Sequence, residues 1–541
     1  MSSHFTEEEQ RLLSKYVSDP TGPVYVVYPA AMPGMIGAAY ARYSRAKGGF
    51  RETLLKEFIE DGHLDAEHAD KLITRVLIAF GDDSVQEMES AWVSIEEVSN
   101  VLTKIIEDLR LTAAIEQSTR YVFYDQVDEA GRFRYYREPT IMASRHAKRF
   151  EETMDFVFGT YVRLIEPMQE YFRGRKPLAQ AQYEIRQGQG KTTYAQCQDD
   201  EARKDFERTY KMDIRTKACD TLRILLPACT RTNVGLHTNG RSFEHLLRRL
   251  YSSDLPEAQT LATQIHAQLN TVIPRYVQRA ARSEYLVETR HAMQTLADEL
   301  LGGIEPAPSR RGITLLPRDL GPDGQLAAML FPFCRHSMEQ LVALIKQWGD
   351  ETRQRIRRTY IGQRRTRRDR PGRALEFGYP WEIEMVLDLG IYRDLHRHRM
   401  LTQERQRYTV ELGFTTLLDD IREAGFLDDV MACVERVDAL YYELTRDLGP
   451  DIAQYVVLLG HNIRCRFGFN DRAIQHLLEL RTGPQGHRNY RLVGQELYRL
   501  MIARDGDRIR DMLGFVDLND YDWPRGDSEA GQRAKEAKLT T

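Results

Sequence analysis

The stretch RDLHRHRMLTQERQRYTVEL at residues 393–412 decides how the rest of the chain is interpreted, because it concentrates guanidinium and imidazole groups. Its members are Arg393, Arg397, His398, Arg399, Arg405 and Arg407. If the stretch is helical, residues 393 and 397 share one face, since side chains four positions apart are neighbours on a helix. The cluster is then either a solvated basic face or a binding site for a large anion.

A second stretch favours the binding site over the solvated face. IEDLRLTAAIEQSTRYVFYD at residues 106–125 carries the same Arg-Tyr step near the start of the chain. The pattern N-x-R-x-x-x-H-L-L also occurs twice, at residues 239–247 and 470–478. Recurrence of ordered patterns at matching places indicates that the chain is two divergent copies of one unit of roughly 220–280 residues.

The apolar spacing predicts a predominantly helical α+β fold, in which each copy has a mixed sheet and long helices. VYVVYPA at residues 24–30 has the β-branched and aromatic content of a buried strand. Gly, Pro and charged residues in GGIEPAPSRRG are typical of a linker. The expected organisation is a first repeat at 1–301, a linker at 302–312, a second repeat at 313–520 and a disordered tail at 521–541.

Composition limits the class of protein. The 541 residues carry a net charge of −4, which favours neither nucleic acid nor a membrane as a partner. With 42% hydrophobic and 29% charged residues, the chain is expected to fold. The first residues are acidic where a signal peptide is basic, and no run of about 18 apolar residues exists. We therefore expect a cytoplasmic protein. The six cysteines lack CxxC or His-linked metal spacing, which favours reduced thiols without disulfides or a zinc site.

Two further polar stretches carry weaker signals. RQGQGKTTY at residues 186–194 has the end of a phosphate loop, but Ile185 stands where the first glycine belongs, so a flexible loop is favoured. Residues 353–373 contain ten arginines, which could meet a folate tail, a nucleotide or a nucleic acid. Tyr360 is the single aromatic residue in this span, which favours a solvated face or a disordered loop.

The two Arg-Tyr stretches together resemble the signature R-H-R-x-x-S-x-N-E-x-S-x-R-Y of the flavin-dependent thymidylate synthases. The second copy keeps Arg397-His398-Arg399, but its spacing to Arg407-Tyr408 is two residues short and Arg405 replaces the serine. The first copy has Asp108-Leu109-Arg110 at the R-H-R place. It keeps the remainder of the signature at the proper spacing, namely Glu116, Ser118, Arg120 and Tyr121.

The resemblance implies an active site shared between neighbouring subunits, with a flavin side and a nucleotide side. The flavin side falls on residues of the second copy: Arg397, His398, Arg399, Asn470, Arg472 and His476. The substrate side falls on Glu116, Ser118, Arg120, Arg223 and Arg393, and Arg481 is the expected catalytic arginine. Gln454 stands where the second copy needs an equivalent of Arg223, and Leu250 where the first needs one of Arg481. The retained parts therefore make one complete site and the discarded parts one dead site.

Two functions remain open from the sequence. The resemblance implies an enzyme that methylates dUMP, or a close analogue, to dTMP with FAD, NADPH and methylenetetrahydrofolate. Arg481 would stabilise the anion formed when the uracil ring loses its N3 proton, and no cysteine nucleophile is needed. The alternative is a non-catalytic paralogue that binds a nucleotide, a flavin or a nucleic acid in a regulatory or interaction role. Because one chain supplies two family units, the expected assembly is a homodimer acting as a pseudo-tetramer.

Overall fold

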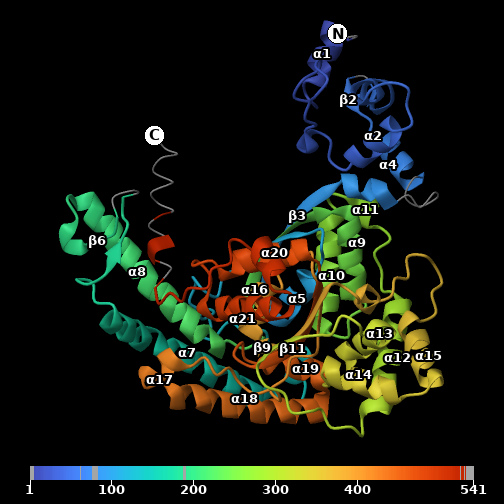
Figure 1. The fold of residues 1–541 in the computed structure, drawn as a ribbon. Helices are drawn as coiled ribbons and strands as arrows, with labels where there is room; N and C mark the ends of the chain where they lie inside the picture. The colour runs from blue at the N-terminus through green and yellow to red at the C-terminus, as the bar shows by residue number, and fades with distance from the viewer. Residues whose placement is uncertain are drawn as a thin grey trace. The chain divides into compact units, whose positions relative to one another are not determined.

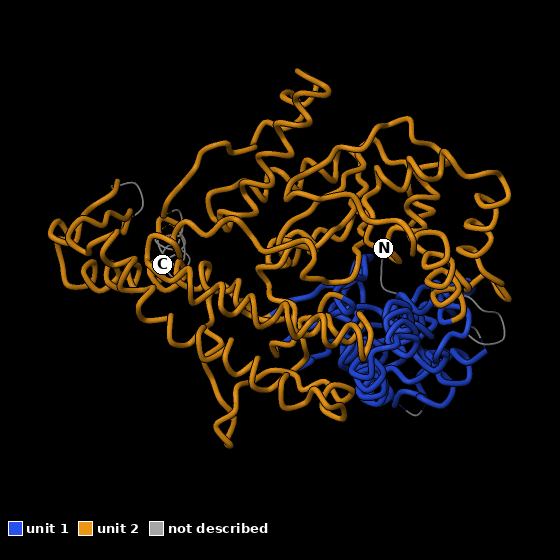
Figure 2. The backbone as a smooth tube through the Cα atoms, turned by 90° about the horizontal axis from the view of Figure 1, so that it is seen from below, with its two compact units in different colours: residues 1–96, 105–116, 233–287 blue, residues 97–104, 117–232, 288–541 orange. Residues whose placement is uncertain are grey.

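The computed structural model describes residues 5–60, 62–75, 83–186, 190–523, 526–528 and 531 (Figure 1). The described chain is a mixed α/β protein with long helices and small antiparallel sheets, in agreement with the predicted α+β class. It forms two compact units (Figure 2). Unit 1 comprises residues 1–96, 105–116 and 233–287, and unit 2 comprises residues 97–104, 117–232 and 288–541.

These units do not coincide with the two predicted repeats, because unit 2 contains parts of both. The boundary between the compact units does not fall at the predicted linker, residues 302–312, which lie inside unit 2. Contact between segments defines a compact unit, whereas resemblance between segments defines a repeat. The division into repeats therefore stays a prediction. Of the predicted disordered tail, residues 521–523, 526–528 and 531 are described and the others lie outside the described part.

Unit 1 contains a three-stranded sheet in the order β3-β7-β4, formed by β3 (Ser90–Ser99), β7 (Arg231–Asn239) and β4 (Ala113–Glu116). The ends of β3 and β7 next to Asn100 and Thr230 belong to unit 2. Helix α9 (Gly240–Tyr251) follows β7, and the side chain of Asn239 caps it by accepting from the Ser242 amide. The apolar positions Phe243, Leu246, Leu247 and Leu250 recur at helical spacing and are buried, which explains why this helix packs as it does.

Other described helices also belong to unit 1. They are α1 (Glu7–Leu13), α2 (Ile36–Tyr43), α3 (Phe50–Thr53), α4 (Ala66–Thr74), α10 (Pro256–Leu269) and α11 (Pro274–Val277). The predicted buried strand at residues 24–30 is wrong. Its residues form one isolated bridge, Val17 to Val27, and Val24 and Val26 are 84% and 64% exposed.

Unit 2 is built on a four-stranded antiparallel sheet in the order β10-β11-β9-β8. Its strands are β8 (Gly312–Leu315), β9 (Trp381–Asp388), β10 (Thr402–Arg405) and β11 (Asn462–Phe469). Every residue of β9 and β11 is buried. Charged side chains on one face neutralise each other: Arg464 Nη1 lies 2.5 Å from Glu384 Oε1, and Arg466 Nη1 lies 2.7 Å from Glu382 Oε2.

Helices cover this sheet and extend from it. The longest are α7 (Ala147–Arg175), α8 (Asp200–Leu222), α12 (Glu284–Leu301, which begins in unit 1), α18 (Leu427–Leu448) and α21 (Arg488–Asp505). Helices α12 to α15, including α13 (Gly321–Leu330), α14 (Met338–Gln347) and α15 (Asp350–Ile361), share one buried apolar cluster. The arginine-rich span 353–373 begins in α15, and its arginines are mostly exposed, as the solvated interpretation expects. Residues 187–189 of the predicted loop at 186–194 lie outside the described residues.

The two halves of the chain share an arrangement of elements. In the first half, β7 lies between β3 and β4, and in the second half, β11 lies between β9 and β10. A helix capped by asparagine follows each of these central strands: Asn239 caps α9, and Asn470 caps α20 (Asp471–Thr482). The first residue after β3, Asn100, donates its amide N–H to Thr230 O, which directly precedes β7. In the equivalent hydrogen bond, the first residue after β9, Leu389, donates its amide N–H to His461 O, which directly precedes β11.

Within unit 2, the equivalent turns before β7 and β11 pair with each other in antiparallel fashion. The Ala228 amide donates to Val457 O at 2.7 Å, and the Leu459 amide donates to Leu226 O at 2.8 Å. Reciprocal pairing of like segments is what a two-fold interface between identical subunits would give. The short 3-10 turns that precede these segments begin at Arg223 and Gln454, the two positions that the sequence comparison matched.

Candidate functional site

The R-H-R motif lies in a turn rather than on a helix. Helix α16 (Leu389–Leu395) begins with Asp388, whose Oδ1 accepts from the Ile391 amide, and ends at Leu395. Residues 396–401 turn the chain into β10, which pairs with β11. The prediction that residues 393 and 397 share a helical face is therefore wrong, because pairing in the sheet requires the chain to leave the helix two residues before Arg397.

His398 joins this turn to helix α20. The Arg481 Nε–H group donates to His398 Nε2 at 2.8 Å, and the His398 ring meets the His476 ring edge-on at 5.5 Å. Burial, with Arg481 and His476 nearby, lowers the pKa of His398 to about 3. The imidazole is consequently neutral at ordinary pH and serves as an acceptor that fixes the orientation of Arg481.

Two arginines of the first half lie in buried ion pairs. Arg120 holds Asp220 with two parallel hydrogen bonds, Nε to Oδ1 at 2.8 Å and Nη2 to Oδ2 at 2.9 Å. Arg223, whose side chain is 4% exposed, donates from Nη2 to Asp394 Oδ2 at 3.0 Å. Burial acts to raise the pKa of Asp394, but Arg223 and Arg120 hold it well below its usual range. Both carboxylates therefore stay charged and keep the guanidinium groups in fixed positions.

Two residues that the sequence analysis did not select connect the arginines of the two halves. The Tyr490 ring lies 5.7 Å from the Arg120 guanidinium and 5.3 Å from that of Arg481, and its hydroxyl is 3.4 Å from Arg120 Nη1. His487 Nδ1 accepts from the Asn489 amide at 3.0 Å. Its Nε2 lies 3.2 Å from Asp220 O, and burial lowers the pKa of His487 to about 3. The only sequence signal for them is position, shortly after Arg481 in the polar segment TGPQGHRNY.

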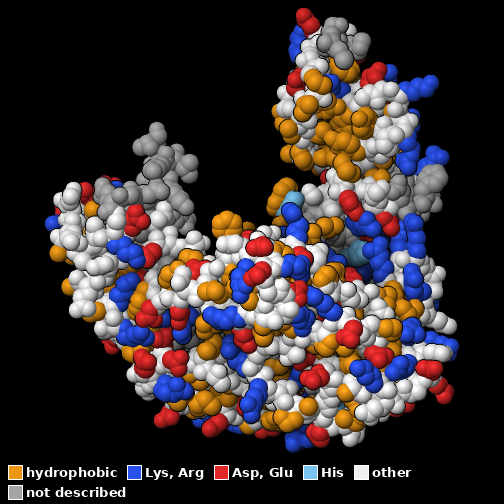
Figure 3. Space-filling view, in the orientation of Figure 1, with side chains coloured by type: hydrophobic (Ala, Val, Ile, Leu, Met, Phe, Trp, Pro, Cys, Tyr) orange, Lys and Arg blue, Asp and Glu red, His pale blue; other side chains and the backbone are white. Residues whose placement is uncertain are grey.

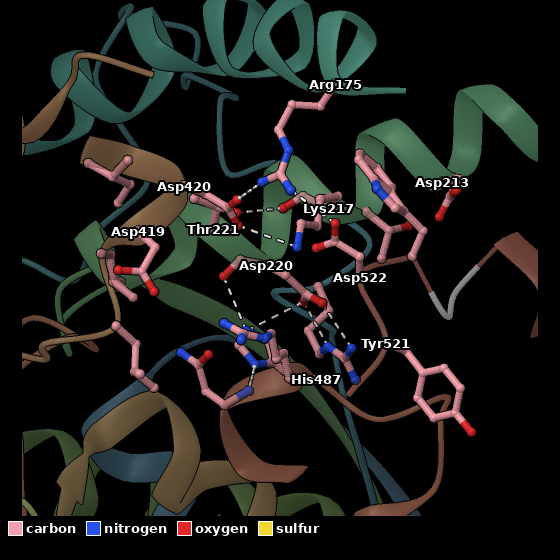
Figure 4. Close-up of a pocket in the computed structure, with 18 of the residues that line it drawn as sticks. Arg175, Asp213, Lys217, Asp220, Thr221, Asp419, Asp420, His487, Tyr521 and Asp522 are labelled. Atoms are coloured by element: carbon pink, nitrogen blue, oxygen red, sulfur yellow. Dashed lines mark hydrogen bonds and ion pairs between the residues drawn. The ribbon is translucent and has the colours of Figure 1, made fainter. Parts of the chain in front are cut away.

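A pocket of about 300 Å³ opens beside this cluster. Its lining includes Arg120, Asp220, His487, Arg175, Lys217 and Asp420. Figure 4 shows Asp220 and His487 on one side of it and Arg175 on the opposite side. Tyr521, Asp522 and Trp523 of the C-terminal segment also contribute to its wall. A volume of this size is at the lower end of that of small-molecule sites. We refer to Arg120, Asp220, Arg223, Asp394, His398, Arg481, His487 and Tyr490 as the composite cluster.

The other predicted flavin-side residues lie around the turn and the first part of α20. Arg397, Arg399, Arg472 and His476 are exposed. Asn470 uses its Oδ1 to cap α20 by accepting from the Ala473 amide at 3.0 Å. Exposed guanidinium groups on two adjoining segments are accessible to an anionic ligand.

The predicted substrate-side residues are more dispersed. Arg393 is buried, at 6% exposure, in α16. Ser118 Oγ accepts from the Arg120 amide at 3.2 Å and so shapes the local turn. Glu116 falls in unit 1, where it ends β4 opposite Val234, whereas all the other predicted site residues fall in unit 2.

The second half has a counterpart of the Arg120–Asp220 pair. Arg407 holds Asp451 with Nε to Oδ1 at 2.7 Å and Nη2 to Oδ2 at 3.0 Å. These side chains are 32% and 43% exposed, against 12% and 18% for Arg120 and Asp220. Gln454 replaces the second arginine, and its Oε1 accepts from the Tyr408 amide. The counterpart pair therefore lacks the second buried cation of the composite cluster.

The six cysteine side chains all lie in the described part of the chain. All six cysteines are free, and burial raises the pKa of Cys334 to about 12 and that of Cys433 to about 11. In the part of the chain that the structure describes, no three His, Cys, Asp or Glu side chains converge as metal ligands. Among the described helices, none is both long and apolar enough to cross a membrane.

The fold and the cluster together define a mixed α/β protein with arginine–carboxylate pairs suited to an anionic ligand. The chain matches the family model described as thymidylate synthase complementing protein over residues 32–275 and 334–504, and it belongs to this flavin-dependent thymidylate synthase family. Two UPF0159 proteins are similar over nearly their whole length. That of Chlamydia muridarum is 34% identical, covering 98% of this chain and 99% of its own, and that of Chlamydia pneumoniae is 33% identical, covering 97% of each. A UPF0159 protein of Thermoplasma acidophilum is 26% identical over 92% of this chain and 98% of its own.

Proposed function

We propose that this protein is a flavin-dependent thymidylate synthase with one composite active site per chain. The reaction is the reductive methylation of dUMP, or a close analogue, to dTMP, with FAD as cofactor and NADPH and methylenetetrahydrofolate as co-substrates. The family membership supports the thymidylate chemistry. The assignment of residues rests on the geometry of the composite cluster.

One observation carries the proposal. Arg120 and Arg223 come from the first half of the chain, yet they lie against Tyr490 and Asp394 of the second half. Tyr490 in turn contacts Arg481, which bonds His398 of the R-H-R turn. These contacts inside unit 2 support the proposal that the nucleotide side comes from one half and the flavin side from the other. Decay without selection would not leave matching halves together.

Arg120 and Arg223 are the proposed phosphate ligands. A guanidinium has five N–H groups, and Asp220 takes two of those on Arg120, while Asp394 takes one of those on Arg223. The remaining N–H groups are held in a fixed fork, which suits the geometry of a phosphate. Arg120 also lines the 300 Å³ pocket, so a phosphate group could reach Arg120 from solvent through this pocket.

Arg481 is the proposed activator of the pyrimidine ring. Its Nε–H group is already used by neutral His398, which leaves the terminal N–H groups for a ligand. A guanidinium held in this way stabilises negative charge on the ring after loss of the N3 proton, without a covalent bond to the enzyme. The raised pKa values of Cys334 and Cys433 are consistent with chemistry that needs no thiolate.

The residues present fit a flavin dinucleotide. Exposed Arg399 and Arg472 can pair with a pyrophosphate, and His476, Arg397 and the side-chain amide of Asn470 stand next to them in the turn and on α20. A reduced flavin would supply the hydride that completes the methyl group. The chain's own contribution is then to hold the two ligands against Arg481 and Tyr490.

The test is release of tritium from C5-labelled dUMP with FAD, NADPH and methylenetetrahydrofolate. We expect release that requires all four components and flavin that titrates at about one FAD per chain, because one composite cluster exists per chain. Purified protein that shows no flavin absorbance even after incubation with FAD would refute the proposal. Two FAD per chain would refute the composite site while leaving the reaction open.

A further inference from the structure

The sheet of the first half lacks a strand that the sheet of the second half has. In unit 2, β8 pairs antiparallel with β9, with Thr314 opposite Glu384 and Leu315 opposite Ile383, and forms the edge of the sheet. In unit 1, β3 is the counterpart of β9, but the described strands place only β7 beside it. The outer edge of β3 is therefore the position at which a fourth strand is missing.

Residues 24–28 are the counterpart of β8 along the chain. VYVVY is followed by Pro29 and then α2, as ITLL is followed by Pro317 and then α13. Neither segment falls in the regions matched by the family model. Residues 24–28 form one bridge, at Val27, and belong to no described sheet, and Val24, Val26 and Tyr28 are 84%, 64% and 39% exposed. Figure 3 shows hydrophobic side chains gathered over this N-terminal part of unit 1.

The backbone of this segment is used on one edge. The Tyr28 amide donates to Tyr16 O at 2.8 Å, the Ser18 amide donates to Val26 O at 2.9 Å, and the Val26 amide donates to Ser18 Oγ at 2.8 Å. Successive residues of a strand direct their amides to opposite sides, so the backbone groups of Tyr25 and Val27 project from the other edge. That edge can pair with another strand.

The sheet that lacks the strand is also bare on one face. Trp92 of β3 is 76% exposed and Ile115 of β4 is 81% exposed. The Trp92 ring stacks on that of His237 of β7 at 4.2 Å, so the three strands present one continuous exposed patch. An exposed apolar patch next to an open strand edge is typical of a surface that another chain covers.

We propose that residues 24–28 of a second copy of this chain form the fourth strand on β3, and that the exchange is reciprocal. In an exchanged pair, each protomer has this combination of features: an extended apolar segment away from its own sheet and an empty edge that receives the same segment from its partner. The strand addition supplies main-chain hydrogen bonds, and the apolar side chains supply the buried area. The proposal concerns assembly and does not depend on flavin or nucleotide chemistry.

The counterpart strands fix the register of the added strand. Glu97 has φ of 61° and β3 has ten residues where β9 has eight, which is typical of a bulge. We align β3 and β9 at their last residues, Ser99 and Asp388, and allow one extra residue in β3 for the bulge, which makes Ser94 the counterpart of Glu384. Aligning Pro29 with Pro317 makes Val26 the counterpart of Thr314. Val26 of one copy therefore lies opposite Ser94 of the other.

Mixing two single variants tests the exchange. We expect Val26→Cys and Ser94→Cys proteins, mixed, partly unfolded and refolded together before mild oxidation, to give a disulfide-linked dimer. Neither variant alone should do so, since equal residues do not meet, and wild type controls for the six native thiols. If the mixture gives no linked dimer, the proposal is wrong. A chain that carries both Val26→Cys and Ser94→Cys provides a further check. If this double variant forms an internal disulfide and stays a monomer, the strand is added within one chain and the exchange is refuted.

Sedimentation of a charge variant provides the second measurement. Val24→Asp with Val26→Asp should convert a dimer to a monomer at micromolar concentration, because the carboxylates would replace the apolar cross-strand contacts of Val24 and Val26 with the Trp92 face of β3 in the exchanged pair. Phe515→Asp, at a site that is 82% exposed in unit 2, is the matched control and should leave the dimer intact. Circular dichroism checks that both variants fold. A dimer that survives the double change would contradict the exchange.

Discussion

Two arginine–aspartate pairs occupy equivalent places in the two halves of the chain, and their surroundings differ. Arg120–Asp220 lies beside a second buried pair, Arg223–Asp394, whereas Arg407–Asp451 lies beside Gln454. By the same correspondence, Ile105 stands where the second half has Asp394. The pair alone is thus a structural feature that both halves keep. The second arginine and its aspartate distinguish the cluster that we assign to the nucleotide.

Replacing Arg223 by glutamine, the residue that the second half has at the equivalent position, should have the largest effect on stability and activity. Arg223→Gln leaves the carboxylate of Asp394 without its principal partner, and removal of one member of a buried ion pair costs about 3–5 kcal/mol. We expect a corresponding fall in the free energy of unfolding, measured with urea, and loss of tritium release.

Arg223→Gln combined with Asp394→Ile puts at both positions the residues found at the equivalent places of the opposite halves, Gln454 for Arg223 and Ile105 for Asp394. Because no buried charge is then left unpaired, most of the stability should return while the activity does not. Recovery of activity in this double variant would show that the second pair is structural only. Failure of stability to recover would mean that other groups depend on these two side chains.

Matched removal of Arg120 and Arg407 sharpens the comparison at the level of binding. Arg120→Ala should weaken dUMP binding by roughly 10–100-fold, since a hydrogen bond to a charged group contributes about 1.5–3 kcal/mol. Arg407→Ala should leave the dissociation constant unchanged and cost under about 1 kcal/mol of stability, because its pair is open to solvent in part, at 32% and 43% exposure. Isothermal titration calorimetry measures both. Equal weakening by the two variants would mean that both halves bind nucleotide.

The stability of the protein at acid pH should depend on His398, a histidine that the first half lacks at the equivalent place. The pKa of His398 is about 3, against an ordinary value near 6.5, because the imidazole is buried beside Arg481 and His476. Between these values the unfolded chain binds a proton that the folded chain does not, so stability is complete above about pH 6.5 and falls as the pH drops toward 3.

His398→Gln should lower the number of protons taken up on unfolding by about one. The slope of the free energy of unfolding against pH should then fall by about 1.4 kcal/mol for each pH unit. Urea unfolding between pH 4 and 7 gives the slope for wild type and variant. The first half has Leu109 at the equivalent place, so the effect reports on the composite cluster. An unchanged slope would show that His398 is protonated in the folded protein.

The motif residues could be recognised directly in the sequence, whereas part of the local structure around them could not be predicted. Arg397, His398 and Arg481 were selected through the resemblance to the family signature, and Asn239 and Asn470 stood out because the pattern N-x-R-x-x-x-H-L-L occurs twice in the chain. The helix through residues 393–397 was wrong because pairing of β10 with β11 ends it, and a tertiary effect of that kind leaves no local signal.

The partners of the arginines could not be predicted for a related reason. Asp220 is 100 residues from Arg120, and Asp394 is 171 residues from Arg223. Aspartates are common on helices, and nothing in the surrounding sequence distinguishes these two. Tyr490 and His487 were missed because they lie outside the repeated patterns. The predicted buried strand at residues 24–30 has the composition of a strand, but among the described residues it forms one isolated bridge, Val27 to Val17, and joins no sheet, which is the observation that the proposed exchange explains.

The two capping asparagines provide the smallest and most selective test. Asn239 and Asn470 each accept a hydrogen bond from the amide three residues further on, at 2.9 and 3.0 Å. Replacement by alanine should cost about 1 kcal/mol of stability in either case, as measured by urea unfolding. Only Asn470→Ala should weaken FAD binding, followed by flavin fluorescence, since its amide NH2 remains available to a ligand beside Arg472. If Asn239→Ala weakens FAD binding equally, then both halves bind flavin, and the difference between the two arginine–aspartate pairs would not mark a single active site.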